Sequence, residues 1–254
     1  MGQIIAIANQ KGGVGKTTTS INLSASLAVA EKRTLLVDLD PQSNASSGVG
    51  IADENIQYTT YQALLGQVET SQVVTTTGIE FLKVLPSTTD LIGAEIELIG
   101  EEDRETRLKK ALNQIRNDFD YILIDCPPSL GLLTINALTA ADSVLVPLQC
   151  EYYAMEGLSQ LTRTIDLIQR QLNPALSLCG ILLTMFDGRN NLSHQVSDEI
   201  RRHFSERVFK TVIPRNVRLS EAPSHGLPVL QYDISSRGAE AYLALARELI
   251  HTGE

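Results

Sequence analysis

Seven short apolar segments alternate with helix-like stretches along the chain, and this alternation constrains the fold more than any other feature. Most of the seven are nearly continuous in apolar residues, which is typical of strands covered on both faces. They are residues 3–8, 34–37, 81–85, 121–124, 143–148, 178–184 and 208–213. The helical patterns are residues 16–30, 104–116, 132–140, 155–172, 192–204 and 239–250. The order predicts an α/β fold: a doubly wound, mainly parallel sheet with helices on both faces.

Length and composition narrow the class of protein further. The 254 residues are 43% hydrophobic and 20% charged, which excludes a disordered chain. With no linker or repeat, we expect residues 1–254 to form one domain, and the more polar residues 53–77 to be a surface excursion of it. No apolar stretch approaches the roughly 20 residues that cross a bilayer, and the start lacks a signal peptide, so we expect a cytoplasmic protein.

A glycine-rich loop follows the first predicted strand and leads directly into a helical pattern. Residues 9–19 read NQKGGVGKTTT. A strand, a glycine-rich turn, Gly-Lys-Thr and a helix, in this order, are typical of a loop that binds nucleotide phosphates. We expect the phosphates to be cradled by backbone N–H groups and by the positive end of the helix dipole. The residues that supply this cradle are Gly12, Gly13, Val14 and Gly15.

Three side chains at the start of the helix complete the predicted phosphate site. Lys16 is expected to reach the β- and γ-phosphates as a charge on a flexible stem. The Thr17 hydroxyl is expected to bind Mg²⁺, and Thr18 is expected to help bind the α-phosphate. A nucleotide and Mg²⁺ are therefore the predicted cofactors.

Carboxylates stand at the ends of two further predicted strands. Asp38 and Asp40 end the strand that begins at residue 34, and Asp125 ends the strand that begins at residue 121. In an open α/β sheet, ligands bind beyond the carboxyl ends of the strands. Phosphoryl transfer needs Mg²⁺ near the phosphates and a group that orients the attacking water. We predict that Asp125 holds a Mg²⁺-bound water, that Asp38 is a second partner of the metal, and that Asp40 orients water.

One lysine in the loop departs from the usual phosphate-loop pattern. That pattern places a glycine five residues before Gly15, where this chain has Gln10, and a second lysine, Lys11, precedes Gly12. The residues alone leave two interpretations open. Lys11 is either a solvated loop charge, or it contacts a nucleotide bound by a second copy of the chain.

These motifs together resemble those of a known family. Residues 11–17, KGGVGKT, resemble the deviant Walker A motif of the ParA/MinD group of ATPases. The sequence DLDPQ from Asp38 resembles the switch I of that group, and DCPPS from Asp125 resembles its switch II. The similarity runs from residue 1 to about residue 247, and residues 151–154, 216–223 and 235–239 are most similar to the chromosomal ParA/Soj branch.

The resemblance implies an ATP-dependent switch. We expect its intrinsic ATP hydrolysis to be slow, because the sequence shows no evident arginine finger and a partner must complete or align the site. It implies that Lys11 contacts the phosphates of the partner subunit in a homodimer that forms around ATP. It also implies that Met185 and Pro214 make apolar contact with the adenine and that Asn216 donates or accepts a hydrogen bond there. For Met185, packing in the core is an equal alternative.

The resemblance further implies nonspecific binding to double-stranded DNA and stimulation by a ParB-type centromere-binding partner. The chain as a whole carries a net charge of −9, which opposes attraction to DNA. Residues 186–218, however, carry seven basic and four acidic residues, a balance of +3. Arg189 and Arg218 match positions that contribute to DNA binding in the family, whereas Arg201 and Arg202 fit a solvated helical face. We expect an acidic body with one basic face, associated with the nucleoid.

Other functions remain as alternatives. A MinD-like positioning ATPase is disfavoured, because residues 247–254 lack the basic amphipathic helix that lies on a membrane. A metabolic ATPase or kinase would need its own acceptor pocket, which residues 53–77 could contain. A scaffold that binds ATP without hydrolysing it conflicts with the presence of both Asp40 and Asp125. The phosphate loop begins about ten residues from the start, so we expect no separate N-terminal DNA-binding domain.

Overall fold

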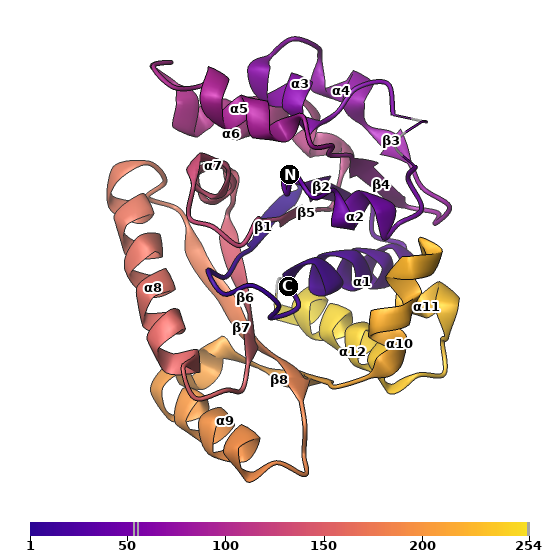
Figure 1. The fold of residues 1–254 in the computed structure, drawn as a ribbon, viewed down its shortest axis with the longest axis vertical. Coiled ribbons are helices and arrows are strands. Elements are labelled where there is room, and N and C mark those ends of the chain that lie inside the picture. The colour runs from indigo at the N-terminus through magenta and orange to yellow at the C-terminus, as the bar shows by residue number, and fades with distance from the viewer. Residues whose placement is uncertain (53, 55, 253–254) are drawn as a thin grey trace.

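The strands form one sheet in the middle of the molecule (Figure 1). The computed structural model describes residues 1–52, 54 and 56–252. The described residues form an eight-stranded sheet with the order β3-β4-β2-β5-β1-β6-β7-β8, and every pair except β3 with β4 is parallel. The strands are β1 (Gln3–Ile7), β2 (Thr34–Asp38), β3 (Thr75–Thr76), β4 (Leu82–Leu85), β5 (Tyr121–Asp125), β6 (Ser143–Gln149), β7 (Ser177–Phe186) and β8 (Val208–Pro214).

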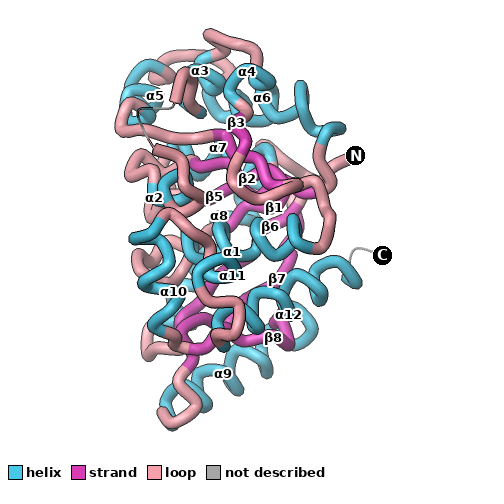
Figure 2. The backbone as a smooth tube through the Cα atoms, turned by 90° about the vertical axis from the view of Figure 1, so that its right-hand side faces the viewer, coloured by secondary structure: helices cyan, strands magenta, loops and turns pink. Residues whose placement is uncertain are grey.

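Helices cover both faces of this sheet (Figures 1 and 2). One face packs against α3 (Thr60–Leu65), α4 (Thr70–Val73), α5 (Leu91–Glu97), α6 (Arg107–Ile115), α7 (Leu132–Ala140), α8 (Ala154–Gln171) and α9 (Asn191–Phe204). The other face packs against α1 (Lys16–Val29), α2 (Asn44–Ser47), α10 (Val217–Glu221), α11 (Val229–Tyr232) and α12 (Arg237–Thr252). Short 3-10 turns are η2 (Arg104–Thr106), η3 (Arg116–Asp118), η4 (Ser205–Arg207) and η5 (Ala222–His225).

The spacing of apolar residues explains why the helices lie where they do. In α6 the buried residues recur three and four positions apart, as Leu108, Ala111, Leu112 and Ile115, so that one stripe faces the sheet. Helix α1 is buried on nearly all sides, because it lies between the sheet and α12. The first turn of α1, which carries the predicted phosphate site, is therefore held in place by packing.

The structure confirms the predicted fold class and the seven predicted strands, with ends that shift by at most one or two residues. The six predicted helices are also present. The prediction missed β3 and the short helices α2, α3, α4, α5, α10 and α11. In the described part of the chain, no helix has both the length and the apolar character needed to cross a membrane.

The segment predicted as a surface excursion is only partly on the surface. Two of its residues, Asp53 and Asn55, lie outside the described residues. Within it, Ala63, Leu64 and Val73 are buried against the core beside α6. The prediction was wrong for these residues because α3 and α4 are too short for a helical period to stand out in the sequence.

Neighbouring strands bring the predicted acidic residues together at one edge of the sheet. Strand β5 lies between β1 and β2, and its last residue, Asp125, is in register with Ile7 on one side and Asp38 on the other. The two carboxylates therefore stand at the carboxyl ends of adjacent strands, next to the loop that follows β1. Parallel pairing places the phosphate loop and the acids at the same edge.

Asn22 joins the first turns of α1 to α11. Its Nδ2 donates to the Thr18 carbonyl over 2.7 Å in a part-buried hydrogen bond, and its Oδ1 accepts from the Val229 backbone N–H over 2.7 Å in a buried one. We expect Asn22→Ala to lower the free energy of unfolding by about 1–3 kcal/mol, because the Val229 N–H loses its partner. Urea unfolding measures the change, with Asn113→Ala on the exposed face of α6 as the control. Equal destabilisation by the two variants would contradict this account.

Candidate functional site

The loop between β1 and α1 takes a backbone path that needs glycine. Gly13 and Gly15 have φ values of 73° and 88°, in the left-handed region that disfavours residues with a Cβ. The Asn9 side chain anchors the start of the loop: its Nδ2 donates to the Pro147 carbonyl, and its Oδ1 accepts from the Lys11 N–H. At the other side, the Thr184 hydroxyl donates to the Val14 carbonyl over 2.7 Å. The predicted cradle is thus fixed to β6 and β7.

Lys16 is buried at the first turn of α1, with its amino group folded over the loop. Its Nζ donates to the Lys11 carbonyl over 3.1 Å. Burial lowers the pKa of Lys16, and the nearby charges of Asp125 and Asp40 act in the opposite direction. A partly desolvated ammonium group in such a loop is a strong attractor for an anion, because little water screens its charge.

Two carboxylates are buried side by side behind the loop. Asp38 and Asp125 are both inaccessible to solvent. Burial raises the pKa of Asp38 to about 6, although hydrogen bonds from the Ser46 hydroxyl and N–H, each at 2.7 Å, oppose the rise. Burial raises the pKa of Asp125 to about 7, and the charge of Asp38 adds to this rise. The pair lacks a neutralising cation within this chain other than Lys16, among the described residues.

One oxygen of this pair has no partner. Asp125 Oδ1 accepts from the Ser20 hydroxyl over 2.7 Å, whereas Asp125 Oδ2 is buried with no hydrogen-bond partner among the described residues. The nearby Thr17 side chain also acts to lower the pKa of Asp125, so the two side chains are adjacent. Hard oxygen ligands of this kind suit Mg²⁺ or a water bound to it. The residues present therefore fit the predicted metal, and Thr17 and Asp125 are the side chains that would hold it or its bound water.

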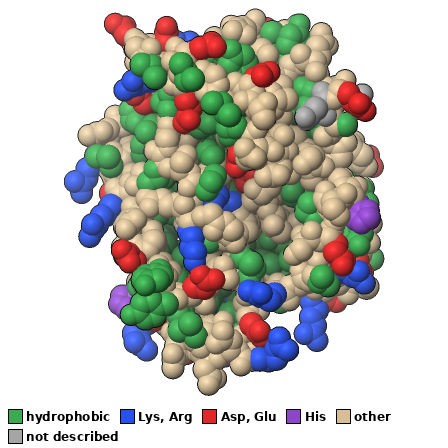
Figure 3. Space-filling model, in the orientation of Figure 1, with side chains coloured by type: hydrophobic (Ala, Val, Ile, Leu, Met, Phe, Trp, Pro, Cys, Tyr) green, Lys and Arg blue, Asp and Glu red, His purple; other side chains and the backbone are tan. Residues whose placement is uncertain are grey.

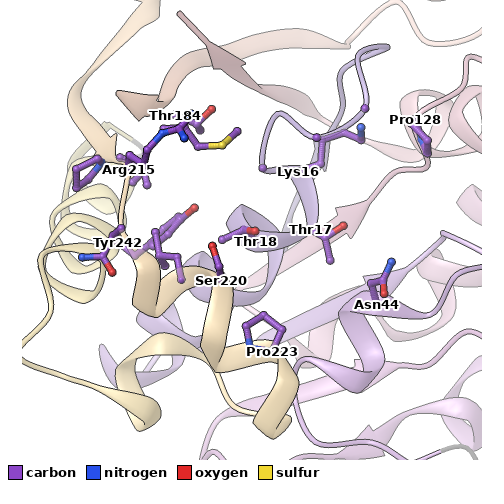
Figure 4. A pocket seen from close by; sticks show the side chains of 18 of the residues that line it. Lys16, Thr17, Thr18, Asn44, Pro128, Thr184, Arg215, Ser220, Pro223 and Tyr242 are labelled. Carbon is purple, nitrogen blue, oxygen red and sulfur yellow. The ribbon is translucent and has the colours of Figure 1, made fainter. Parts of the chain in front are cut away.

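A cavity of about 620 Å³ opens beside the loop (Figure 4). Three groups of residues line it. The loop and α1 contribute Gly12, Gly13, Gly15, Lys16, Thr17 and Thr18; the segments after β2 and β5 contribute Asp40, Gln42, Asn44 and Pro128; the remaining side is Thr184, Met185, Ile213, Pro214, Arg215, Asn216, Leu219, Ser220, Pro223 and Tyr242. Its size suits a nucleotide. Of the residues predicted to bind the nucleotide or the metal, Val14, Asp38, Asp125 and Lys11 are absent from the lining.

The structure places the three predicted adenine contacts together in the wall of this cavity. Met185 and Pro214 stand at the ends of β7 and β8, and Met185 has an unusual positive φ of 47°. The Asn216 Oδ1 is already used, because it caps α10 by accepting from the Arg218 N–H over 2.9 Å. The Asn216 Nδ2 makes no hydrogen bond among the described residues and can donate to a base. Their contact with adenine stays a prediction.

Sequence reasoning missed several residues that shape this site. Tyr242, from α12, lines the cavity, and its hydroxyl lies 3.1 Å from the Thr19 hydroxyl. Ser20 holds Asp125, and Ser46 holds Asp38. Small hydroxyl residues inside helices carry no distinct sequence signal, so only the packing of α1 and α2 against the strand ends reveals their role.

Lys11 lies outside the cavity of its own chain. Its amino group forms an ion pair with Glu151, at the loop between β6 and α8, and its side chain is half exposed. Tyr152 and Tyr153 follow, with their rings in an edge-to-face pair, and both are strongly exposed. Exposed aromatic residues beside a charged loop are typical of a surface that another protein covers.

The basic residues predicted to form one face divide into two groups. Arg189 and Arg218 lie beyond the carboxyl ends of β7 and β8, as does Arg215. Arg201 and Lys210 instead lie at the opposite end of β8, where they line a separate groove with Arg247. The expectation of a single basic face was therefore wrong, because α9 runs back along the sheet between the two groups.

Both arginines predicted to bind DNA are paired within the chain. Arg189 is 91% exposed and bonds to Asp187 at 3.1 Å. Arg218 pairs with Glu221 at 2.8 Å and with Asp233 at 3.2 Å. Exposed pairs of this kind contribute about 0–1 kcal/mol, so a phosphate can displace them.

Comparison with known proteins places the chain in a family. A family model described as an AAA domain matches residues 2–178. The chromosome partitioning protein ParA of Myxococcus xanthus is 61% identical over 250 residues, which are 98% of this chain and 88% of that protein. The sporulation initiation inhibitor protein Soj of Bacillus subtilis is 58% identical over 253 residues, the full length of both. The chain belongs to the ParA/Soj family of chromosome-partitioning ATPases.

Solved structures agree with this ParA/Soj assignment. Cobyrinic acid a,c-diamide synthase from Mycobacterium smegmatis, solved with an ATP analogue and magnesium, has a TM-score of 0.87 and 40% identity, covering 100% of this chain and 96% of that one. The cell division ATPase MinD of Pyrococcus furiosus has a TM-score of 0.82 and 27% identity over 99% of this chain and 100% of that one. The predicted family and the predicted ATPase class are confirmed.

The raised pKa values predict how the stability of this ParA/Soj-family chain depends on pH. Asp125 and Asp38 hold protons in the folded chain up to a pH of about 7 and about 6, well above the ordinary value of 3.8. They therefore contribute stability at low pH that is lost as the pH rises through these values. Between about pH 4 and pH 8, we expect the free energy of unfolding of Asp125→Asn to fall by roughly 1–3 kcal/mol less than that of the unaltered chain.

Urea unfolding without nucleotide and with a chelator measures this dependence. The control is Asp198→Asn, on the exposed face of α9. Parallel pH profiles for the unaltered chain and Asp125→Asn would show that the buried pair does not bind protons as the geometry requires.

Proposed function

We propose that the chain is an ATP-gated switch that serves chromosome or plasmid segregation. Two copies hold Mg-ATP between them, the pair binds double-stranded DNA without sequence preference at the nucleoid, and hydrolysis returns single copies. The observation that carries this proposal is the placement of the two loop lysines. Lys16 faces the cavity of its own chain, whereas Lys11, on the same loop, points out of it beside an exposed aromatic pair.

The nucleotide site follows from the buried charges. The loop N–H groups and Lys16 hold the phosphates, Met185 and Pro214 contact the base, and Mg²⁺ binds beside Thr17 and Asp125. When bound, Mg²⁺ neutralises charge on the phosphate oxygens. The neighbour from Mycobacterium smegmatis, which is described with an ATP analogue and magnesium, supports this choice of ligands.

Asp40 is the residue placed to orient the attacking water. It lines the cavity, whereas Asp38 and Asp125 do not, and it is close enough to Lys16 to influence its pKa. Its Oδ1 accepts from the Gln42 N–H over 3.0 Å, which fixes the carboxylate beside the phosphates. Arg215 lines the cavity next to Pro214, at the end away from Pro128 in Figure 4. Among the described residues, no arginine therefore lies beside Asp40 in the cavity lining. We expect slow ATP turnover that a ParB-type partner accelerates.

The dimer follows from the surface around Lys11. Gly12 has no atom within 4 Å of the position that a Cβ would take, so the single chain leaves this part of the loop uncovered. Tyr152 and Tyr153 provide an apolar contact surface beside it. A second copy that docks here places its nucleotide within reach of Lys11, and each nucleotide is then held by both chains.

DNA binding follows from pairing two modest basic patches. Arg189, Arg215 and Arg218 lie at the same edge of the sheet as the nucleotide cavity. One patch on a chain of net charge −9 attracts DNA weakly, and two patches in a dimer add their phosphate contacts. Binding should therefore require ATP and fall steeply with salt.

A metabolic function has one observation in its favour, the name of the synthase from Mycobacterium smegmatis. The relatives that are 58% and 61% identical to this chain are named for sporulation control and chromosome partitioning. Turnover that rises with a small-molecule acceptor, but not with DNA and a partner protein, would favour the metabolic function.

Three substitutions test the switch by DNA retardation with Mg-ATP. We expect Lys16→Ala to lose DNA binding because it loses the nucleotide. We expect Gly12→Val to lose it because the valine, which fits the single chain, blocks the second copy. We expect Asp40→Ala to hold DNA persistently because hydrolysis stops. Equal DNA binding by all forms without nucleotide would exclude the switch.

The ion pair between Lys11 and Glu151 must open before Lys11 can reach a partner. We therefore expect Glu151→Gln to favour the dimer by up to a few-fold, since an exposed pair contributes no more than about 1 kcal/mol. ATP turnover per chain, measured against protein concentration, should reach its midpoint at a lower concentration. Glu156→Gln, on the exposed face of α8, is the control. A shift to higher concentration would indicate that Glu151 supports the dimer instead.

A further inference from the structure

Helix α5 exposes an apolar stripe that nothing in the described chain covers. Ile92, Ile96 and Ile99 are 52%, 66% and 70% exposed. They recur four and three positions apart, so they share one face of the helix and its last turn. The opposite face of α5 packs against the core, where Leu91 and Leu98 are buried. We call the three isoleucines and the carboxylates around them the α5 face.

The α5 face is also the most acidic part of the chain. Residues 90–103 carry six carboxylates and no basic residue, which is two thirds of the net charge of −9. Glu101 and Asp103 pair with bases of α6, and Glu97 accepts from the Tyr61 hydroxyl. The others have no ion-pair partner among the described residues; they are Asp90, Glu95 and Glu102. Figure 3 shows acidic and hydrophobic side chains next to one another over the region where Figure 1 places α5.

The α5 face touches the segment that leads to the nucleotide cavity. A Cβ on Gly131 would lie 2.6 Å from Glu95 Oε1, so α5 packs directly on the start of α7. The Ser129 carbonyl accepts from the Thr134 hydroxyl over 2.5 Å, which ties the preceding loop to the same helix. Pro128, one residue earlier, lines the nucleotide cavity. A ligand bound to the α5 face would therefore act on the loop that carries Pro128, which lines the nucleotide cavity.

Charge decides what kind of ligand fits. Two copies that meet through this face by two-fold symmetry would bring like charges together, which costs free energy. DNA and anionic membranes are repelled for the same reason. A segment with lysine or arginine around an apolar stripe can bury the isoleucines and pair with the carboxylates at the same time. The stripe spans about 10 Å, so two to three helical turns of a partner cover it.

We propose that the α5 face docks a short basic amphipathic helix of a partner protein and passes its effect to the loop at Pro128. The proposal rests on the proposed function in one respect, because it supplies the surface through which a stimulating partner acts on the nucleotide site. It concerns residues that lie apart from the nucleotide cavity and from Lys11. Its failure would therefore leave the ATP-gated switch intact.

The test uses the full chain and a synthetic 18-residue peptide with leucines on one helical face and lysines on the other. The chain has no tryptophan, so one tryptophan in the peptide reports binding by its fluorescence. We expect the peptide to bind with an affinity that falls with salt, and Ile92→Ser with Ile96→Ser to weaken it at least tenfold. Asp90→Asn with Glu102→Gln should weaken it and reduce the salt dependence. Ile234→Ser, at an exposed isoleucine of another region, is the control.

Two further measurements separate the outcomes. The peptide should raise the ATP turnover of the unaltered chain but not that of the Ile92/Ile96 variant. Without the peptide, the two proteins should bind DNA equally with Mg-ATP in the retardation assay. Loss of DNA retardation in the unaltered chain would instead contradict the switch itself. The docking proposal is overturned if the peptide fails to bind, or binds all variants equally. It is also overturned if the chain alone self-associates through the isoleucines, which would make a second copy the occupant.

Discussion

The site depends on burying three ionisable groups at the carboxyl ends of β1, β2 and β5. Asp38 and Asp125 are fully buried and adjacent, and Lys16 is the neighbouring base. Burial is the largest cause that raises the pKa values of the acids and lowers that of the lysine, and the charges of the neighbouring carboxylates add to the rise at the acids. Bound phosphates offset the cost of burying the charge of Lys16, and a bound divalent cation offsets the cost of burying the charges of the carboxylates. The rest of the fold, with α1 enclosed on nearly all sides, keeps these groups in place.

The same arrangement explains how the chain can respond to its ligand. The loop and the strand ends are held by packing, whereas Lys11, the aromatic pair and the α5 face all lie on uncovered surface. A rigid nucleotide site surrounded by open contact surfaces suits a protein whose partners change with the bound nucleotide. The two basic groups, at opposite ends of β8, give the proposed dimer more than one place to contact a charged partner.

Much of this architecture could be predicted because long elements leave strong patterns. Apolar runs identified β1, β2 and β5, and the order of Gly, Lys and Thr identified the start of α1. Short elements could not be found in this way: β3 has two residues and forms only because β4 offers it an edge, and α5 has apolar residues on both faces. The pairing of Lys11 with Glu151 joins positions 140 residues apart, and no local pattern indicates such a contact.

The proposed contact of Lys11 with the nucleotide of a second copy can be tested by measuring the mass of the protein in solution. Sedimentation or light scattering should show Asp40→Ala changing from the mass of one chain without nucleotide to that of two chains with Mg-ATP. Lys11→Ala added to Asp40→Ala should remain at the mass of one chain under the same conditions. An unchanged mass for Asp40→Ala with Mg-ATP, or equal dimer formation with and without Lys11, would contradict the account.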